Sequence, residues 1–204
     1  MSHPLLPPST ESKSLLARLI YRFPKGTIWQ TRYLCLPAVL ILSTYHFAKV
    51  EGPIWAPLFF FLGGAALWTL LEYFFHRFIL HYAATSEPGR ALVDRLHVFH
   101  HHDPKDQTQV CIPPVLLMVF GLAIFGGLTL IPGLAPAAPS FITLGLMSLM
   151  VVYDIAHFST HYMPATNRVL IALKKHHMLH HFQDSTKRYG VTSPFWDWVF
   201  KTLN

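Results

Sequence analysis

Histidines form four short clusters in this chain, and their spacing constrains the fold more than any other feature. Twelve of the fourteen histidines fall in these clusters. Residues three and four positions apart share one face of an α-helix, so most rings within a cluster would point the same way. Imidazoles gathered in this way would repel one another as cations or lose solvation as neutral bases, and a metal ion removes both problems. The chain is therefore expected to bring these helices together at a metal site.

Helix geometry nominates ten of the histidines as metal ligands. They are His76, His81, His97, His100, His101, His157, His161, His177, His180 and His181. At about 100° per residue, His102 and His176 point away from the shared faces. His81 follows His76 by five residues, so we expect it at a helix end or bulge. Ten nitrogen ligands exceed what one first-row ion coordinates, which predicts two ions whose element imidazole alone does not identify.

The composition indicates a membrane protein. Of the 204 residues, 52% are hydrophobic and 13% are charged, and the mean hydropathy is +0.35. Crossing the hydrocarbon core takes about 20 helical residues. Four apolar runs reach or approach that length: 28–50, 54–75, 112–131 and 141–156. The second contains Gly63 and Gly64, where close helix contact is expected. The predicted fold class is all-α, integral membrane, with four transmembrane helices.

The positions of the basic residues predict how these helices are oriented. Of the sixteen Lys and Arg residues, only Lys49 lies near the connection between the first two runs, at the end of the first, and none lies between the last two. By the positive-inside rule, both termini and the long middle segment are cytoplasmic. All four histidine clusters then lie on that side, in a cytoplasmic helical cap that holds the dinuclear site. The net charge of +6 suits lipid headgroups. It is spread over three flanks, so we expect no nucleic-acid partner.

The first 27 residues differ from the rest. Residues 1–14 contain three prolines and several serines, which predicts a disordered tail. Residues 15–23 alternate apolar residues with Arg18 and Arg22, as in a short interfacial segment at the headgroups. No cleavable signal peptide is expected, because the first apolar run begins late and has no clear cleavage site. Residues 28–204 are predicted to form one membrane-embedded domain.

Two carboxylates in the apolar runs are candidates for the site. Glu72 lies four residues before His76, and Asp154 lies three residues before His157. A carboxylate at that depth is costly unless it is paired. Each is therefore predicted to hold the second ring nitrogen of its histidine. The alternative is a structural pairing, with Arg77 or with another helix.

The ordered set of motifs resembles the fatty acid hydroxylase superfamily, and most closely the fatty acid 2-hydroxylases. The matching segments are 72–81 (EYFFHRFILH), 97–101 (HVFHH) with Pro113 and Pro114 after it, 153–161 (YDIAHFSTH), 173–181 (LKKHHMLHH) and 189–197 (YGVTSPFWD). The resemblance runs from about Trp68 to the C-terminus. It implies a four-helix membrane anchor, ten histidines binding two metal ions, and oxygen insertion beside an acyl carboxyl carbon. The family's ten ligands fall on the ten histidines nominated above, so residues 28–204 are expected to be a membrane-embedded fatty acid hydroxylase domain.

The expected chemistry needs a redox metal. An alkyl C–H bond offers no acidic proton and no leaving group, whereas a metal that activates dioxygen can attack it. The expected reaction uses two iron ions, O2, two electrons and two protons to hydroxylate a fatty acid or a ceramide-type lipid. Zinc cannot change oxidation state, so zinc in purified protein would be an inactive substitute. Tyr153 is a candidate to contact substrate or bound oxygen, with Glu72 and Asp154 orienting the ligands.

Family members in yeast and animals often carry a fused cytochrome b5 domain, and this sequence has no segment for one. We therefore expect a separate electron donor, cytochrome b5-like or ferredoxin-like, and favour a bacterial inner membrane over the endoplasmic reticulum. Two alternative functions are open. One is a related sterol, carotenoid or alkane hydroxylase or desaturase with the same metal site. The other is a membrane metal transporter or sensor, which would need more polar spans than these.

Overall fold

Helices make up the regular structure in residues 13–204, the part of the chain that the computed structural model describes. Of the predicted disordered tail, only residues 13 and 14 fall within this range. In chain order the elements are α1 (Leu15–Tyr21), α2 (Ile28–Gln30), η1 (Thr31–Cys35), α3 (Leu36–Ala48), α4 (Trp55–Phe74), η2 (Phe75–Leu80), α5 (Glu87–Val93), η3 (Asp94–Val98), α6 (Phe99–His102), η4 (Gln107–Gln109), α7 (Pro114–Thr129), α8 (Ala138–Tyr162), α9 (Arg168–Phe182) and α10 (Phe195–Val199). The elements η1 to η3 are π-helical and η4 is a 3₁₀ turn. Among the described residues, Gly26 and Cys111 form an isolated antiparallel β-bridge.

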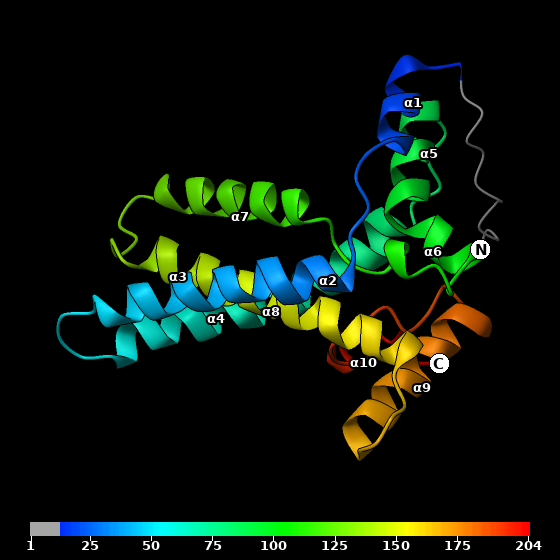
Figure 1. The fold of residues 1–204 in the computed structure, drawn as a ribbon. Helices are drawn as coiled ribbons and strands as arrows, with labels where there is room; N and C mark the ends of the chain where they lie inside the picture. Colours follow the sequence, from blue (N-terminus) through cyan, green and yellow to red (C-terminus); the bar gives the residue numbers. More distant parts are fainter. Residues whose placement is uncertain (1–12) are drawn as a thin grey trace.

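The four apolar runs form four long helices that lie alongside one another (Figure 1). The central helix is α8, which packs against α3, α4 and α7. It continues past the apolar run 141–156 to Tyr162. Asp154 does not interrupt it, because this fully buried carboxylate accepts hydrogen bonds from Thr31 and Ile112 of other segments. Two stretches are long and apolar enough to cross a membrane, Trp55–Leu80 and Ala138–Tyr162, while α7 is shorter at 16 residues.

Glycine sets the closest approach between α4 and α8. A Cβ atom on Gly64 would overlap the carbonyl oxygen of Ile142, and one on Gly145 would overlap the carbonyl oxygen of Phe61. The predicted close helix contact is therefore present at Gly64. Gly63, its neighbour, faces open space.

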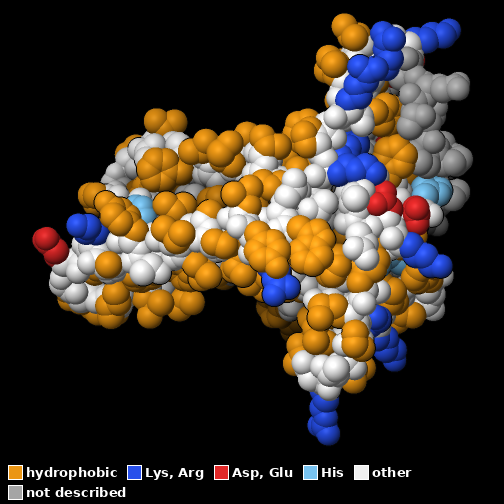
Figure 2. Space-filling model, in the orientation of Figure 1, with side chains coloured by type: hydrophobic (Ala, Val, Ile, Leu, Met, Phe, Trp, Pro, Cys, Tyr) orange, Lys and Arg blue, Asp and Glu red, His pale blue; other side chains and the backbone are white. Residues whose placement is uncertain are grey.

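The outward faces of these four helices are apolar. Ile41 of α3, Phe59 of α4 and Leu122 of α7 are 67%, 71% and 64% exposed. Figure 2 shows hydrophobic side chains spread over this layer, with charged side chains at its ends and on the two arms that leave it. Large contiguous apolar surfaces are typical of contact with lipid.

The two arms come from the N-terminal half and the C-terminal end of the chain (Figure 1). In the first arm α1 packs against α5, so the segment expected at residues 15–23 is helical over Leu15–Tyr21. The second arm contains α9. Asn167 caps its N-terminal end, because Asn167 Oδ1 accepts a hydrogen bond of 2.9 Å from the Leu170 amide. The histidine clusters lie where the arms join the long helices.

Candidate metal centre

The ten nominated histidines come together in two groups of five. Within each group, one ring nitrogen from every histidine lies within 4.8 Å of the others. The first group is His76, His81, His97, His101 and His180. The second group is His100, His157, His161, His177 and His181. All ten side chains that helix spacing nominated thus lie at one site, and metal binding by them stays a prediction.

Neighbouring histidines of one helix belong to different groups. His180 is in the first group and His181 in the second, and His101 and His100 divide in the same way. The rings of His101 and His181 stack with their centroids 4.1 Å apart. Helices α6 and α9 therefore each supply histidines to both groups. The two groups are in direct contact through the stacked rings of His101 and His181.

A π-helix accounts for the five-residue spacing of His76 and His81. Its hydrogen bonds run from residue i to residue i+5, so residues five apart share a face. His76 lies within η2 and His81 caps its C-terminal end, which confirms the helix end or bulge expected there. The Nε2 atoms of these two residues lie 2.9 Å and 3.1 Å from Nε2 of His97.

The spacing of the ring nitrogens suits metal ligation. In the second group, Nε2 of His177 lies 2.9 Å from that of His161 and 3.1 Å from that of His181. Metal–nitrogen bonds of about 2.1 Å would put ligands at right angles about 3 Å apart. His180 Nε2 is buried without a hydrogen-bond partner, a costly arrangement for an unligated group. The donor set therefore fits an imidazole-binding ion such as iron, zinc, copper or nickel.

Burial keeps these imidazoles in the form that binds metals. It lowers the pKa of His180 to about 4. Burial, together with the neighbouring His180 and His101, lowers the pKa of His81 to about 2. The pKa values of His97 and His177 are lowered by burial in the same direction. At neutral pH the rings are therefore neutral, with a lone pair available for a cation.

Glu72 does not hold His76, contrary to the prediction. Its carboxylate accepts hydrogen bonds from the Val191 and Thr192 amides, at 2.6 Å and 2.9 Å, and from the Thr192 hydroxyl. The Nδ1 atom of His76 lies 2.5 Å from the carbonyl oxygen of Tyr189. Three donors from one loop satisfy the buried carboxylate more fully than one imidazole would. Glu72 therefore acts on His76 indirectly, by fixing the loop that carries Tyr189.

Asp154 does not hold His157 either. It accepts hydrogen bonds from the Thr31 hydroxyl, at 2.8 Å, and from the Ile112 amide, at 2.9 Å. These residues precede α3 and α7, so Asp154 ties the starts of both segments to α8. The structural alternative, pairing with another segment of the bundle, is confirmed for Asp154.

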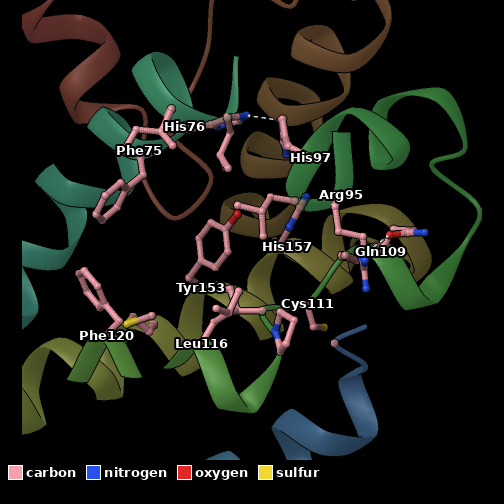
Figure 3. A pocket seen from close by; sticks show the side chains of 18 of the residues that line it. Phe75, His76, Arg95, His97, Gln109, Cys111, Leu116, Phe120, Tyr153 and His157 are labelled. Carbon is pink, nitrogen blue, oxygen red and sulfur yellow. Dashed lines mark hydrogen bonds between the residues drawn. The ribbon is translucent and has the colours of Figure 1, made fainter. Parts of the chain in front are cut away.

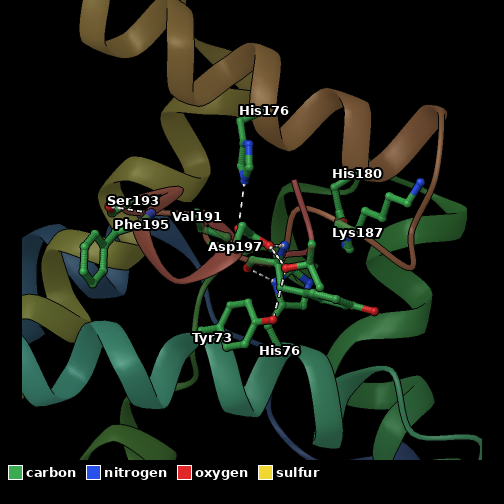
Figure 4. Close-up of polar contacts among 12 residues, drawn as sticks. Tyr73, His76, His176, His180, Lys187, Val191, Ser193, Phe195 and Asp197 are labelled. Carbon is green, nitrogen blue, oxygen red and sulfur yellow. Dashed lines mark hydrogen bonds and ion pairs between the residues drawn. The ribbon is translucent and has the colours of Figure 1, made fainter. Parts of the chain in front are cut away.

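Asp197 is a positioning residue to which the histidine pattern did not point. It is fully buried and accepts hydrogen bonds of 2.8 Å from the Tyr189 and Gly190 amides and 2.7 Å from the Thr202 hydroxyl. His176 points away from the ligand groups, as predicted, and its Nε2 lies 3.1 Å from Asp197 (Figure 4). Burial opposes ionisation, but these hydrogen bonds hold the pKa of Asp197 below its usual value. The signal in the sequence was a lone carboxylate within an aromatic segment.

A cavity of about 440 Å³ borders both groups. Its lining includes His76 from the first group and His157 from the second, together with apolar side chains such as Phe75 and Phe120 (Figure 3). Tyr153 lies on the cavity wall, with its ring centroid 5.5 Å from that of His157. An apolar chain that entered the cavity would lie against the site where metals are predicted.

Comparisons with known proteins agree with this geometry. The chain is 37% identical over 140 residues to a protein of Arabidopsis thaliana named dihydroceramide fatty acyl 2-hydroxylase FAH2. The aligned region covers 69% of this chain and 58% of that protein. It is 32% identical over 203 residues to the ceramide very long chain fatty acid hydroxylase SCS7 of Saccharomyces cerevisiae, covering 94% of this chain and 49% of that protein. The chain thus spans about half the length of the yeast relative.

The architecture also matches a solved structure. Full-length scs7p, in which only the hydroxylase domain is visible, superposes on 97% of this chain and 81% of its own with a TM-score of 0.77 and 27% identity. Residues 61–202 match the family model described as fatty acid hydroxylase. That range contains all ten grouped histidines, so the chain belongs to the fatty acid hydroxylase family.

Proposed function

We propose that the chain is a membrane-bound, non-heme di-iron monooxygenase that hydroxylates the acyl chain of a fatty acid or fatty-acyl lipid at the carbon next to the carboxyl carbon. The observation that carries this proposal is the pair of buried five-histidine groups on the wall of an apolar cavity. The names of the relatives, among them fatty acid 2-hydroxylase in Rattus norvegicus, support the position of hydroxylation.

The proposed reaction balances with dioxygen and an electron donor. One C–H bond breaks and one C–OH bond forms, while O2 takes up two electrons and two protons. One oxygen atom enters the product and the other leaves as water. Iron supplies the activation of O2 when it is bound, whereas zinc in the same ligands would give no redox chemistry. A separate cytochrome b5-like or ferredoxin-like protein supplies the electrons.

The chain's own groups orient the ligands and hold the substrate. The carbonyl oxygens of Tyr189 and Lys187 accept hydrogen bonds from Nδ1 of His76 and His180, at 2.5 Å and 2.6 Å. With Nδ1 protonated in this way, each Nε2 keeps its lone pair for the metal. The apolar cavity excludes water and receives the acyl chain, and Tyr153 on its wall contacts the substrate.

We propose that all four long helices cross the membrane, with the histidine groups and both termini cytoplasmic. The basic residues support this orientation, because all but Lys49 lie in the N-terminal part, the middle segment or the C-terminal part of the chain, which are the parts placed on the cytoplasmic side. Helix α1 would lie at the headgroups, because Leu15, Leu16 and Leu19 are 64%, 57% and 54% exposed beside Arg18. The named relatives are eukaryotic, so they give no support to the expectation of a bacterial inner membrane.

Mass spectrometry of lipids from cells that express the chain under isotopically labelled dioxygen tests the proposal. We expect 2-hydroxyacyl chains carrying one labelled oxygen atom. His177→Ala should abolish them, because His177 is fully buried at the centre of the second group. His102→Ala is the matched control, since His102 is exposed and outside both groups. Labelled sterols, carotenoids or alkanes would favour the related oxidases, and metal uptake without oxygen consumption would favour a transporter.

A further inference from the structure

The cavity beside the histidine groups has a cationic side chain, Arg95, in its lining. Arg95 and Gln109 lie on one side in Figure 3, Phe75 and Phe120 lie on the other, and His157 lies between them. An acyl substrate also has one polar end and one apolar end. The cavity therefore has a direction, with the polar end of a substrate at Arg95 and its tail toward the phenylalanines.

The guanidinium of Arg95 has more N–H donors than its hydrogen bonds use. Its Nε and Nη2 atoms donate to the Phe23 carbonyl oxygen, at 3.1 Å and 2.7 Å, and its Nη1 donates to Gln109 Oε1 at 3.1 Å. A guanidinium carries five N–H bonds. These three contacts use three of the five, so two N–H bonds of the guanidinium have no hydrogen-bond partner among the described residues.

The charge of Arg95 is not neutralised by a contacting acid. Its side chain is buried, at 7% exposure, and none of the ion pairs within 4.0 Å among the described residues includes it. Asp106 is paired with Lys25 at 3.0 Å, and Asp94 accepts a hydrogen bond of 2.9 Å from Tyr21. A buried cation whose direct partners are neutral is costly. An anionic ligand in the cavity would offset that cost.

We propose that Arg95 binds the carboxylate of a free fatty acid, so that the chain prefers unesterified acids to ceramides, whose amide head is neutral. This inference rests on the proposed acyl hydroxylation. A carboxylate accepts two N–H bonds of one guanidinium side by side. Arg95, His97 and His157 all line the cavity. A carboxylate held at Arg95 therefore places the acyl chain in the cavity that borders the histidine groups.

Ligand binding to metal-free protein in lipid nanodiscs tests the proposal. The ligands are palmitate, palmitamide and an N-palmitoyl ceramide, each displacing a fluorescent fatty acid at about pH 8, where carboxylic acids are ionised. We expect palmitate to bind at least about tenfold tighter than palmitamide or the ceramide, as a charge-assisted pair would give. Equal affinities for the three ligands would overturn the proposal.

Two variants separate recognition by Arg95 from its contact with Phe23. Gln109→Glu keeps a hydrogen-bond acceptor at the same position and places a carboxylate beside the guanidinium of Arg95. This carboxylate neutralises the positive charge, so the preference for palmitate should disappear while the fold is retained. Arg95→Gln should remove it as well. Arg90→Gln is the control, because Arg90 is exposed and outside the cavity lining. A preference for palmitate that survives Gln109→Glu would contradict the proposal.

The binding experiment is independent of turnover. Selective binding of palmitate without labelled product would leave the role of Arg95 intact and count against the proposed hydroxylation. Labelled product together with equal affinity for palmitate and palmitamide would support the proposed hydroxylation and contradict the role of Arg95.

Discussion

Glu72 and Asp154 stabilise the surroundings of the ten grouped histidines without a hydrogen bond to any of those rings. Short spacing along a helix placed Glu72 near His76 and Asp154 near His157, and this spacing predicted direct contacts. The actual donors come from far along the chain, since Val191 lies 119 positions after Glu72 and Thr31 lies 123 positions before Asp154. Such partners depend on tertiary packing, which the spacing of neighbouring residues does not report.

Substituting Asp154 distinguishes a structural role from ligand orientation. We expect Asp154→Ala to lower the free energy of unfolding by on the order of 3 kcal/mol, because two buried donors lose their acceptor. The fraction that remains folded should keep its metal content. Elemental analysis measures the metal, and denaturation in detergent measures the free energy of unfolding. Thr31→Val removes one of the two hydrogen bonds and should cost about 1 kcal/mol. Loss of metal at unchanged stability would instead mean that Asp154 orients a ligand.

At the scale of helices, the sequence predicted those features that depend on local periodicity. The ten ligand candidates and the irregular turn before His81 follow from spacing within one segment. The division of the histidines into two groups does not, because it depends on how α6 and α9 approach each other. The partners of Asp154 do not follow from spacing either, since Thr31 and Ile112 lie in other segments.

Adjacent glycines provide a matched test of the contact between α4 and α8. We expect Gly64→Ala to destabilise the protein by roughly 1–3 kcal/mol, because the new methyl group overlaps the Ile142 carbonyl. Gly63→Ala adds its methyl group in open space and should be neutral or slightly stabilising, since alanine favours helix. Thermal unfolding in detergent measures both variants. Equal effects would show that the two helices do not meet at Gly64.

At the scale of the whole molecule, ligand burial is coupled to folding. The long helices and both arms meet at the histidine groups (Figure 1), so the rings are desolvated when these parts pack together. Six of the ten are at most 3% exposed: His76, His97, His100, His157, His177 and His180. The metal-free fold must therefore keep several imidazoles neutral that the unfolded chain would protonate in mild acid.

This coupling predicts that the metal-free protein loses stability in mild acid. Burial lowers the pKa of His180 to about 4, against about 6.5 in an unfolded chain. As the pH falls below about 6.5, the unfolded chain takes up a proton that the folded chain excludes, so stability falls. From about pH 6.5 to about pH 5, His180 alone accounts for about 1.6 kcal/mol. Circular dichroism melts should show a falling midpoint, and a smaller change in metal-loaded protein, because bound metal keeps its ligands deprotonated. A midpoint that stays constant over this range without metal would contradict the burial of neutral histidines.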